Sequence, residues 1–281
     1  MRSIGKKQAK YQGCATHSAK VYSKTRGRKS YCAKFVSKIL KMNIKSHVPN
    51  TITLGNLFCG CIAVVYAFED TATHPDHFEM AFLFVGLGIF LDFFDGFFAR
   101  LFKVSSPLGL QLDSLADMVT SGVTPGVTMF FLLRNASGMP EGSWIPYLGF
   151  LITLGSCYRL ANFNIDTRQT DSFIGMPTPG NALFILSLPL VKMGGSMEGL
   201  ELLTNQWVLL VITVFSTFIM NAEIPLFSLK FKKMTVRDNL LQISFLLLSV
   251  LLLVFYVYLA VPLIILSYIF LSILNNKLRK V

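Results

Sequence analysis

Four aspartates lie in two apolar stretches of the chain that a short turn separates. Asp92 and Asp95 fall near the end of the stretch FLDFFDGFFARLF. Asp113 and Asp117 fall near the start of the stretch LQLDSLADMVTSGVTPG. Spacings of three and four residues place the members of each pair on one face of a helix. Counted outward from a turn near Ser105 at ~1.5 Å per residue, all four acids reach similar depths in an antiparallel hairpin, so they can converge on one site.

Carboxylates at this density need positive charge beside them, because like charges a few ångströms apart cannot all stay ionised. Ligands that offer only oxygen select hard cations such as Mg²⁺, Mn²⁺ or Ca²⁺, and the two stretches lack the His and Cys that zinc prefers. Two divalent ions would balance four carboxylates and leave open positions for phosphate oxygens, which is the arrangement that serves displacement at phosphorus. Two other interpretations are a proton relay and a cation path through a transporter.

Residues between the acids favour a bulky phosphate-bearing ligand. Gly96 follows Asp95 directly and Gly109 precedes Asp113, so side chains are missing where a ligand could approach the backbone. Arg100 lies two turns from the first pair of acids, where it could bind a phosphate or extend to the membrane interface.

The composition of the whole chain requires the acids to be carried by membrane helices. Of the 281 residues, 53% are hydrophobic and 15% are charged, against about 25% charged in an average soluble domain. Apolar runs near the ~20 residues that cross a bilayer recur along the chain, the fifth and eighth being shorter. They fall near residues 50–68, 79–101, 110–133, 144–163, 179–194, 206–221, 239–257 and 260–276. We therefore predict an all-α, polytopic membrane bundle of about eight transmembrane helices, and we exclude soluble enzyme folds and β-barrels, which need alternating segments of ~10 residues.

The positive charge of the chain is concentrated at its amino-terminal end. Residues 1–45 hold 13 of the 26 Lys and Arg and no Asp or Glu, although the net charge of the whole chain is only +11. Such a tail could bind anionic lipid head groups or nucleic acid. It could also be a solvated leader, or an extension upstream of a coding region that starts at Met42. We expect membrane lipids and no nucleic acid as partners.

Charges in the connecting segments predict the orientation of the helices. Basic residues gather in the tail, at Lys103, at Arg168, in the stretch 230–237 and at the carboxyl end, whereas acidic residues dominate the other connections. By the positive-inside rule, both termini and the turn between the two acidic stretches are cytoplasmic. We divide the chain into a basic tail over residues 1–47, a catalytic bundle of six helices over residues 48–238 and an accessory transmembrane hairpin over residues 239–281.

The acids and their neighbours form one pattern, D-x2-D-G-x2-A-R-x8-G-x3-D-x3-D. Its eight fixed positions are Asp92, Asp95, Gly96, Ala99, Arg100, Gly109, Asp113 and Asp117. The pattern matches without departure the signature of the CDP-alcohol phosphatidyltransferases, so the chain resembles that family here. The resemblance implies transfer of a phosphatidyl group from a CDP-linked lipid to an alcohol, with release of CMP.

The same resemblance assigns roles to the residues of the pattern. It implies two divalent ions, Mg²⁺ or Mn²⁺, held by Asp92, Asp95 and Asp113. Asp117 becomes a metal-adjacent residue and the general base for the acceptor hydroxyl. The remaining positions, which are expected to contact the substrate, are Gly96, Ala99, Arg100 and Gly109.

A second region resembles one branch of the family, the integral-membrane phosphatidylserine synthases. The segment 48–60, VPNTITLGNLFCG, is similar to the PN-x2-T-x2-N-L-x-C-G pattern of that branch. Asn50, Thr53 and Asn56 form a polar stripe on one helix face and are expected to bind cytidine or its phosphates. Capping of the helix is an alternative role for Asn50 alone.

Three further segments resemble the same branch: YRLANFN at 158–164, GMPTP at 175–179 and IPLFSLK at 224–230. The first departs from the RLARFN element of the branch, because Asn162 stands where a second arginine is expected. Arg159 could pair with the carboxylate of serine, bind a lipid phosphate or anchor its helix.

The branch implies CDP-diacylglycerol and L-serine as substrates of a homodimer in the cytoplasmic (inner) membrane. One alternative keeps the chemistry and changes the acceptor to glycerol 3-phosphate or an inositol phosphate. Such acceptors demand more cations than Arg159 and Arg168 supply. Another alternative is a divalent-cation transporter, which predicts a polar path that continues across the bilayer through Ser121, Thr124 and Thr128.

Overall fold

The computed structural model describes residues 44–68, 76–104, 106–166, 174–193, 200–227 and 239–279. Contacts between residues divide the chain into two units, Met1–His47 and Val48–Val281. The predicted basic tail over residues 1–47 lies outside the described residues except at its end, where α2 begins.

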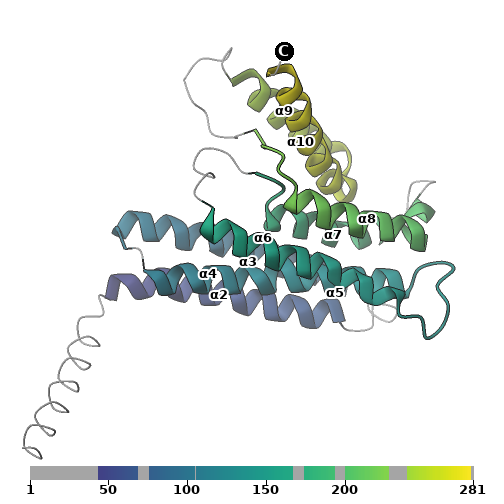
Figure 1. Ribbon diagram of the computed structural model, residues 1–281, viewed down its shortest axis with the longest axis horizontal. Helices are drawn as coiled ribbons and strands as arrows, with labels where there is room; N and C mark the ends of the chain where they lie inside the picture. Colours follow the sequence, from purple (N-terminus) through teal and green to yellow (C-terminus); the bar gives the residue numbers. More distant parts are fainter. Residues whose placement is uncertain are drawn as a thin grey trace, which may run out of the picture. The chain divides into compact units, whose positions relative to one another are not determined.

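The described residues are almost entirely helical (Figure 1). The α-helices are α2 (Ile44–Phe68), α3 (His77–Phe102), α4 (Pro107–Asp117), α5 (Thr124–Arg134), α6 (Leu151–Ile165), α7 (Thr178–Met193), α8 (Gln206–Asn221), α9 (Leu240–Phe255) and α10 (Val257–Arg279). Three short elements complete them: the π-helix η1 (Met118–Val123) and the 3₁₀ helices η2 (Ile145–Phe150) and η3 (Leu200–Thr204). Within these ranges extended pairing is limited to two isolated bridges, Ser137 with Asn205 and Ile174 with Pro225. The prediction of an all-α fold is confirmed.

Four helical segments are long and apolar enough to cross a membrane. They are His47–Phe68, His77–Phe102, Pro107–Arg134 and Leu259–Leu278, and α7, α8 and α9 contain shorter apolar helices. Large apolar side chains such as Phe58, Phe93 and Phe218 are exposed on these helices, and a surface of that kind suits lipid rather than water. The prediction of a polytopic helical membrane protein is confirmed, whereas the count of eight spans stays a prediction.

A π-helical turn joins α4 to α5, so that residues Pro107–Arg134 form one continuous helical run. In this turn the backbone N–H of Thr124 donates to the carbonyl of Val119, five residues earlier. Pro125 follows and has no N–H of its own to extend the regular helical ladder. The carbonyl of Gly122 accepts a hydrogen bond from the Thr153 hydroxyl of α6, at 3.0 Å. The turn is therefore held by a neighbouring helix, and such turns are frequent at functional sites.

Two groups of buried apolar side chains hold the helices together. The larger group comes from α5, α6, α7, α8 and α10, and it includes Met129, Leu133, Ile152, Ile185, Leu209 and Met220. The smaller group joins α2 and α3 to α5 and α7 through small residues such as Ala63, Ala67 and Ala81. Small side chains let membrane helices approach closely, and close packing is the main source of helix association in lipid.

Helices α9 and α10 pack against each other, and α10 also packs against α7. The hydroxyl of Tyr268 on α10 donates to the carbonyl of Phe227 at 2.9 Å, which ties the segment after α8 to α10. The predicted accessory hairpin therefore contacts the helices that precede it, through α10.

Helix η2 lies against the backbone of α5 at Gly149. A Cβ atom added at Gly149 would lie 2.6 Å from the backbone nitrogen of Phe130 and 3.0 Å from the carbonyl carbon of Met129. A methyl group therefore cannot be accommodated without moving one of the two elements.

Replacement of Gly149 by alanine is expected to destabilise the protein by about 1–3 kcal/mol, because overpacking against backbone forces the elements apart. The midpoint of thermal unfolding in detergent, followed by circular dichroism, measures the effect. Gly86→Ala on α3 is the matched control, because a Cβ atom there would meet nothing within 4 Å and alanine favours helix. Equal midpoints for the two variants would contradict the backbone contact.

Candidate active site

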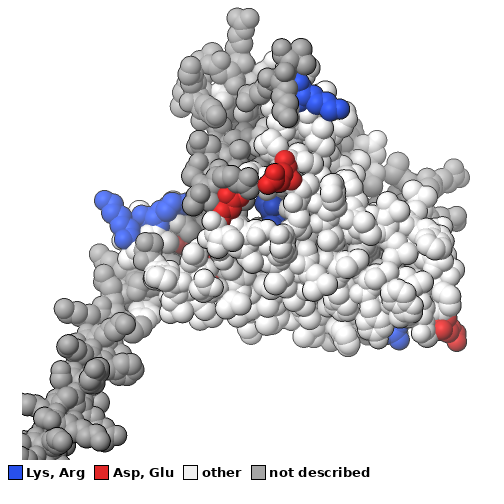
Figure 2. All heavy atoms as spheres, viewed as in Figure 1, with Lys and Arg blue, Asp and Glu red and all other residues white. Residues whose placement is uncertain are grey.

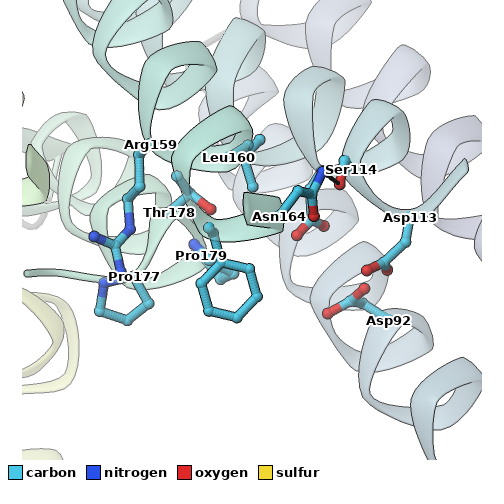
Figure 3. A pocket seen from close by; sticks show the side chains of 11 residues that line it. Asp92, Asp113, Ser114, Arg159, Leu160, Asn164, Pro177, Thr178 and Pro179 are labelled. Carbon is cyan, nitrogen blue, oxygen red and sulfur yellow. Dashed lines mark hydrogen bonds between the residues drawn. The ribbon is translucent and has the colours of Figure 1, made fainter. Parts of the chain in front are cut away.

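Three carboxylates meet between α3 and α4. Oxygen atoms of Asp92, Asp95 and Asp113 all lie within 4.8 Å of one another. Asp95 is buried, with 7% of its surface exposed, and the other two are half-buried. Figure 3 shows the carboxylates of Asp92 and Asp113 facing each other across the two helices. The structure therefore brings together three of the four predicted acids.

The fourth acid adjoins this cluster without belonging to it. Asp117 is the last residue of α4 and directly precedes the π-helical turn. It lines the same pocket as Asp92 and Asp113, and its charge acts on Asp92. A group placed in that pocket can therefore touch the cluster and Asp117 together.

The turn between α3 and α4 is fixed by caps at both helix ends. Helix α3 ends at Lys103, whose N–H donates to the carbonyl of Arg100 at 3.2 Å and whose left-handed backbone (φ 53°) directs the N–H of Val104 to the carbonyl of Ala99 at 3.0 Å. Helix α4 begins after Ser106, whose hydroxyl accepts the N–H of Gly109 at 2.9 Å, a common N-cap arrangement. These caps set where each helix places its acids. Ser105 itself lies outside the described residues.

Two residues of the polar stripe on α2 hold the aspartates in place. The hydroxyl of Thr53 donates to the Asp95 carboxylate, and the amide of Asn56 donates to the Asp117 carboxylate at 3.2 Å. Both side chains are buried. We expected these residues to bind cytidine, and that role stays a prediction beside the positioning role that the structure gives them.

Asn50 lies one turn before Thr53 on α2. A Cβ atom added at Gly109 would lie 3.2 Å from the Asn50 side-chain oxygen and 3.1 Å from the Ser106 hydroxyl. Glycine at position 109 therefore keeps α2 and the first turn of α4 close together.

A pocket opens from the acids toward α6 and the first residues of α7 (Figure 3). Its lining residues are Asp92, Asp113, Ser114, Asp117, Arg159, Leu160, Phe163, Asn164, Pro177, Thr178 and Pro179. The amide of Asn164 donates to the Ser114 hydroxyl at 2.8 Å, which links α6 to α4 along the wall. Ser114, Asn164 and Thr178 line the pocket but were not predicted as site residues. The segments 158–164 and 175–179, which carry two of them, were a signal that could have found them.

Arg159 anchors the far wall of this pocket. Only 8% of its surface is exposed. Its guanidinium donates to the carbonyl of Ile174 at 2.9 Å, to that of Gly175 at 3.2 Å and to that of Met220. These bonds tie α6 to the segment before α7 and to the end of α8. Of the three roles considered for Arg159, the structure displays the anchoring role, and pairing with a serine carboxylate stays a prediction.

The other residues of the signature lie away from the pocket lining. Arg100 is exposed in the last turn of α3, and Ala99 beside it is half-buried. A Cβ atom at Gly96 would meet no atom within 4 Å among the described residues. Open space at Gly96 would admit a bulky ligand beside Asp95. Contact of Gly96, Ala99 and Arg100 with the substrate stays a prediction.

Figure 2 shows that the visible face of the described residues is largely uncharged, with few Lys, Arg, Asp or Glu side chains.

The cluster fits a hard divalent cation. Its donors are carboxylate oxygens from two helices, and the charges that act most strongly on Asp92 are those of Asp117, Asp113 and Asp95, all of one sign. Oxygen donors within a few ångströms suit Mg²⁺, Mn²⁺ or Ca²⁺. A cation would offset a repulsion that hydrogen bonds from Thr53 and Asn56 alone relieve only in part.

Comparison with known proteins identifies the family of this site. The model of the CDP-alcohol phosphatidyltransferase family matches residues 46–219, a range that contains all four aspartates and ends within α8. Three curated relatives are CDP-diacylglycerol–serine O-phosphatidyltransferases. The Bacillus subtilis protein is 37% identical over 148 residues, which are 50% of this chain and 76% of that protein. The Helicobacter pylori J99 protein is 34% identical over 140 residues, 49% of this chain and 55% of that protein.

The Saccharomyces cerevisiae protein is 34% identical over 152 residues, 50% of this chain and 53% of that protein. The matched region thus spans about half the length of the H. pylori and yeast relatives and three quarters of the B. subtilis protein. Because the family model covers well over half of the chain together with its acidic cluster, the chain belongs to the CDP-alcohol phosphatidyltransferase family.

Proposed function

We propose that this chain transfers the phosphatidyl group of CDP-diacylglycerol to the hydroxyl of L-serine, giving phosphatidylserine and CMP. The observation that carries the proposal is the meeting of Asp92, Asp95 and Asp113 within 4.8 Å beside an open pocket. The names of the relatives support serine as the acceptor.

In this proposal Asp92, Asp95 and Asp113 hold two divalent ions, Mg²⁺ or Mn²⁺, with Asp117 beside them. When bound, the ions neutralise charge on the pyrophosphate and make CMP a better leaving group. The chain itself contributes the fixed positions of the acids, through the caps at Lys103 and Ser106.

Asp117 acts as the general base. Serine Oγ is a weak nucleophile at neutral pH, so a carboxylate within hydrogen-bonding reach is needed to accept its proton. As Oγ bonds to the phosphorus of the phosphatidyl group, the bond from that phosphorus to the CMP oxygen breaks, and the hydroxyl proton moves to Asp117. Its position on the pocket wall supports this role.

The charge of the pocket favours an acceptor without a phosphate group. Arg159 is the one basic residue among the side chains that line the described pocket, and three carbonyls already occupy its guanidinium. Glycerol 3-phosphate or an inositol phosphate would bring a charge of about −2 that this wall compensates poorly. Arg168 and Lys230 lie outside the described residues.

A divalent-cation transporter is not supported. The hydroxyls of Thr124 and Thr128, which would continue a polar path, are buried and donate to carbonyls of their own helical run, those of Val119 and Thr124. A hydroxyl that donates its proton keeps lone pairs that can bind a cation, and the buried Ser121 hydroxyl has no hydrogen-bond partner among the described residues. The case against a transporter therefore rests on family membership, because the matched family consists of transferases.

We further propose that the enzyme lies in the cytoplasmic (inner) membrane, with both termini and the acids on the cytoplasmic side. It works as a homodimer. Residues 48–238 form the catalytic bundle, and residues 239–281 form the accessory hairpin.

Replacing any one of the three clustered acids by asparagine is expected to lower CMP release at least about 100-fold, because each supplies a ligand to the ions. Purified Asp92→Asn, Asp95→Asn and Asp113→Asn proteins would be assayed with CDP-diacylglycerol, L-serine and Mn²⁺. Direct Mn²⁺ binding, measured by electron paramagnetic resonance, should weaken in parallel. Glu141→Gln, an exposed acid outside the site, is the control, and full activity in the three variants would refute the metal assignment.

Asp117→Asn is expected to reduce kcat by about 100-fold or more, in the range usual for loss of a general base. The KM for CDP-diacylglycerol should change little, because the three clustered acids still hold the ions. Steady-state kinetics over both substrates separates these effects. Unchanged kcat would remove the base assignment and leave the metal site intact.

The acceptor is tested by supplying each alcohol in turn to the purified protein with CDP-diacylglycerol and Mn²⁺ or Mg²⁺. CMP is expected to appear with L-serine and to stay near background with glycerol 3-phosphate or inositol phosphate, because the pocket wall offers little free positive charge. Chromatography of the lipid product identifies phosphatidylserine. Release of CMP with a phosphorylated acceptor instead would replace serine in the proposal and preserve the reaction type.

A further inference from the structure

A chain of hydrogen bonds buried between α2 and η1 ends at Asp117. The hydroxyl of Thr120 donates to the side-chain oxygen of Asn56 at 2.8 Å. The nitrogen of the same amide donates to the Asp117 carboxylate at 3.2 Å. Thr120 and Asn56 have no exposed surface, so water does not compete for the bond between them.

Thr120 and Asp117 together favour one orientation of the Asn56 amide. An amide has an acceptor end and a donor end, and rotation by half a turn exchanges them. If the nitrogen faced Thr120, the Asn56 oxygen would face the Asp117 carboxylate, and two acceptors would oppose each other. The carboxylate accepts the N–H and the Thr120 hydroxyl donates to the oxygen, so both partners favour the orientation in which the N–H is directed at Asp117. The Thr120 hydroxyl also lies 3.2 Å from the backbone carbonyl of Asn56, but the side-chain contact is the shorter.

Two glycines on neighbouring helices make room for this pair. A Cβ atom at Gly88 of α3 would lie 2.7 Å from the Asn56 side-chain oxygen and 2.8 Å from the Thr120 methyl carbon. A Cβ atom at Gly60 of α2 would lie 3.0 Å from both the Cα and the backbone nitrogen of Thr120. The pair thus fills the space that the missing Cβ atoms of Gly60 and Gly88 leave open.

The π-helical turn fixes Thr120 relative to Asp117. Thr120 is the third residue of η1, and Asp117 is the residue directly before η1. The Thr153 hydroxyl on α6 holds the Gly122 carbonyl of the same turn, and η1 packs against α6, α7 and α3. The turn that carries this donor is therefore held by helices other than α2.

We propose that Thr120 is a positioning residue, which acts through Asn56 to hold the Asp117 carboxylate in the orientation that accepts the proton of the acceptor hydroxyl. This inference rests on the proposed function, in which Asp117 is the base. Thr120 does not line the pocket, so it acts on the reaction without touching the substrate.

The test compares Thr120→Val, which removes the hydroxyl and keeps the shape, with Thr120→Ser, which restores the hydroxyl. Thr120→Val is expected to lower kcat about 10-fold, within the range seen when partners of site residues are lost, with KM for CDP-diacylglycerol unchanged. Thr120→Ser should recover most of kcat. Thr128→Val is the matched control, because the Thr128 hydroxyl is equally buried and bonds only the Thr124 carbonyl of its own helical run at 3.0 Å.

A double-mutant cycle separates positioning from general destabilisation. In the Asp117→Asn background, Thr120→Val should cause no further loss of kcat, because the group that it positions is already gone. Equal kcat for wild type and Thr120→Val overturns the inference, and so does a full additional loss in the Asp117→Asn background or an equal loss in Thr128→Val. Thermal unfolding in detergent shows whether each variant is folded. Absence of CMP release by wild type with L-serine would instead count against the proposed function.

Discussion

The repulsion among carboxylates held close together inside apolar helices is the constraint on which this structure depends. Asp92, Asp95 and Asp113 bring oxygens within 4.8 Å of one another, where water is scarce and like charges repel strongly. Hydrogen bonds from Thr53 and Asn56 relieve part of this repulsion at Asp95 and Asp117. A bound divalent cation would offset the rest, and the three carboxylates present the oxygen donors that such an ion prefers.

Close packing of the helices keeps these carboxylates at fixed positions relative to one another. Lipid gives little reason for helices to associate, so contact depends on shape and on buried polar bonds. Gly60, Gly88 and Gly149 each stand where another element's backbone or polar side chain fills the space of a methyl group. The polar bonds then fix direction: α2 reaches α3 through Thr53, and it reaches α4 and η1 through Asn56. Helix α2, which carries none of the clustered acids, thus helps to position α3 and α4, which carry them.

Spacing alone predicted that four acids converge, because helical periodicity and the short turn determine which faces and depths they share, and three of the four form the cluster. It also predicted that Asn50, Thr53 and Asn56 share a face, but it could not say what that face meets, since the partners lie 42 and 61 residues away. The hydrogen bond that holds the Gly122 carbonyl of the π-helical turn comes from Thr153 of α6, 31 residues away, so spacing within one helix could not predict it. The contact between Thr120 and Asn56 and the make-up of the pocket wall were not predicted for the same reason, because each joins segments far apart in the sequence.

Arg159 shows how the two ends of the pocket are built by separate means. The acidic end is set by the caps of α3 and α4 and by α2, whereas the far wall is set by three carbonyls that Arg159 draws together from the segment before α7 and the end of α8. Gly175, with φ of 74°, fits there because a Cβ atom would lie 2.9 Å from the Arg159 guanidinium nitrogen. Changes in the far wall can therefore alter which acceptor fits while the acids keep their positions. The acidic end of the pocket can thus stay the same while the far wall changes to fit a different alcohol.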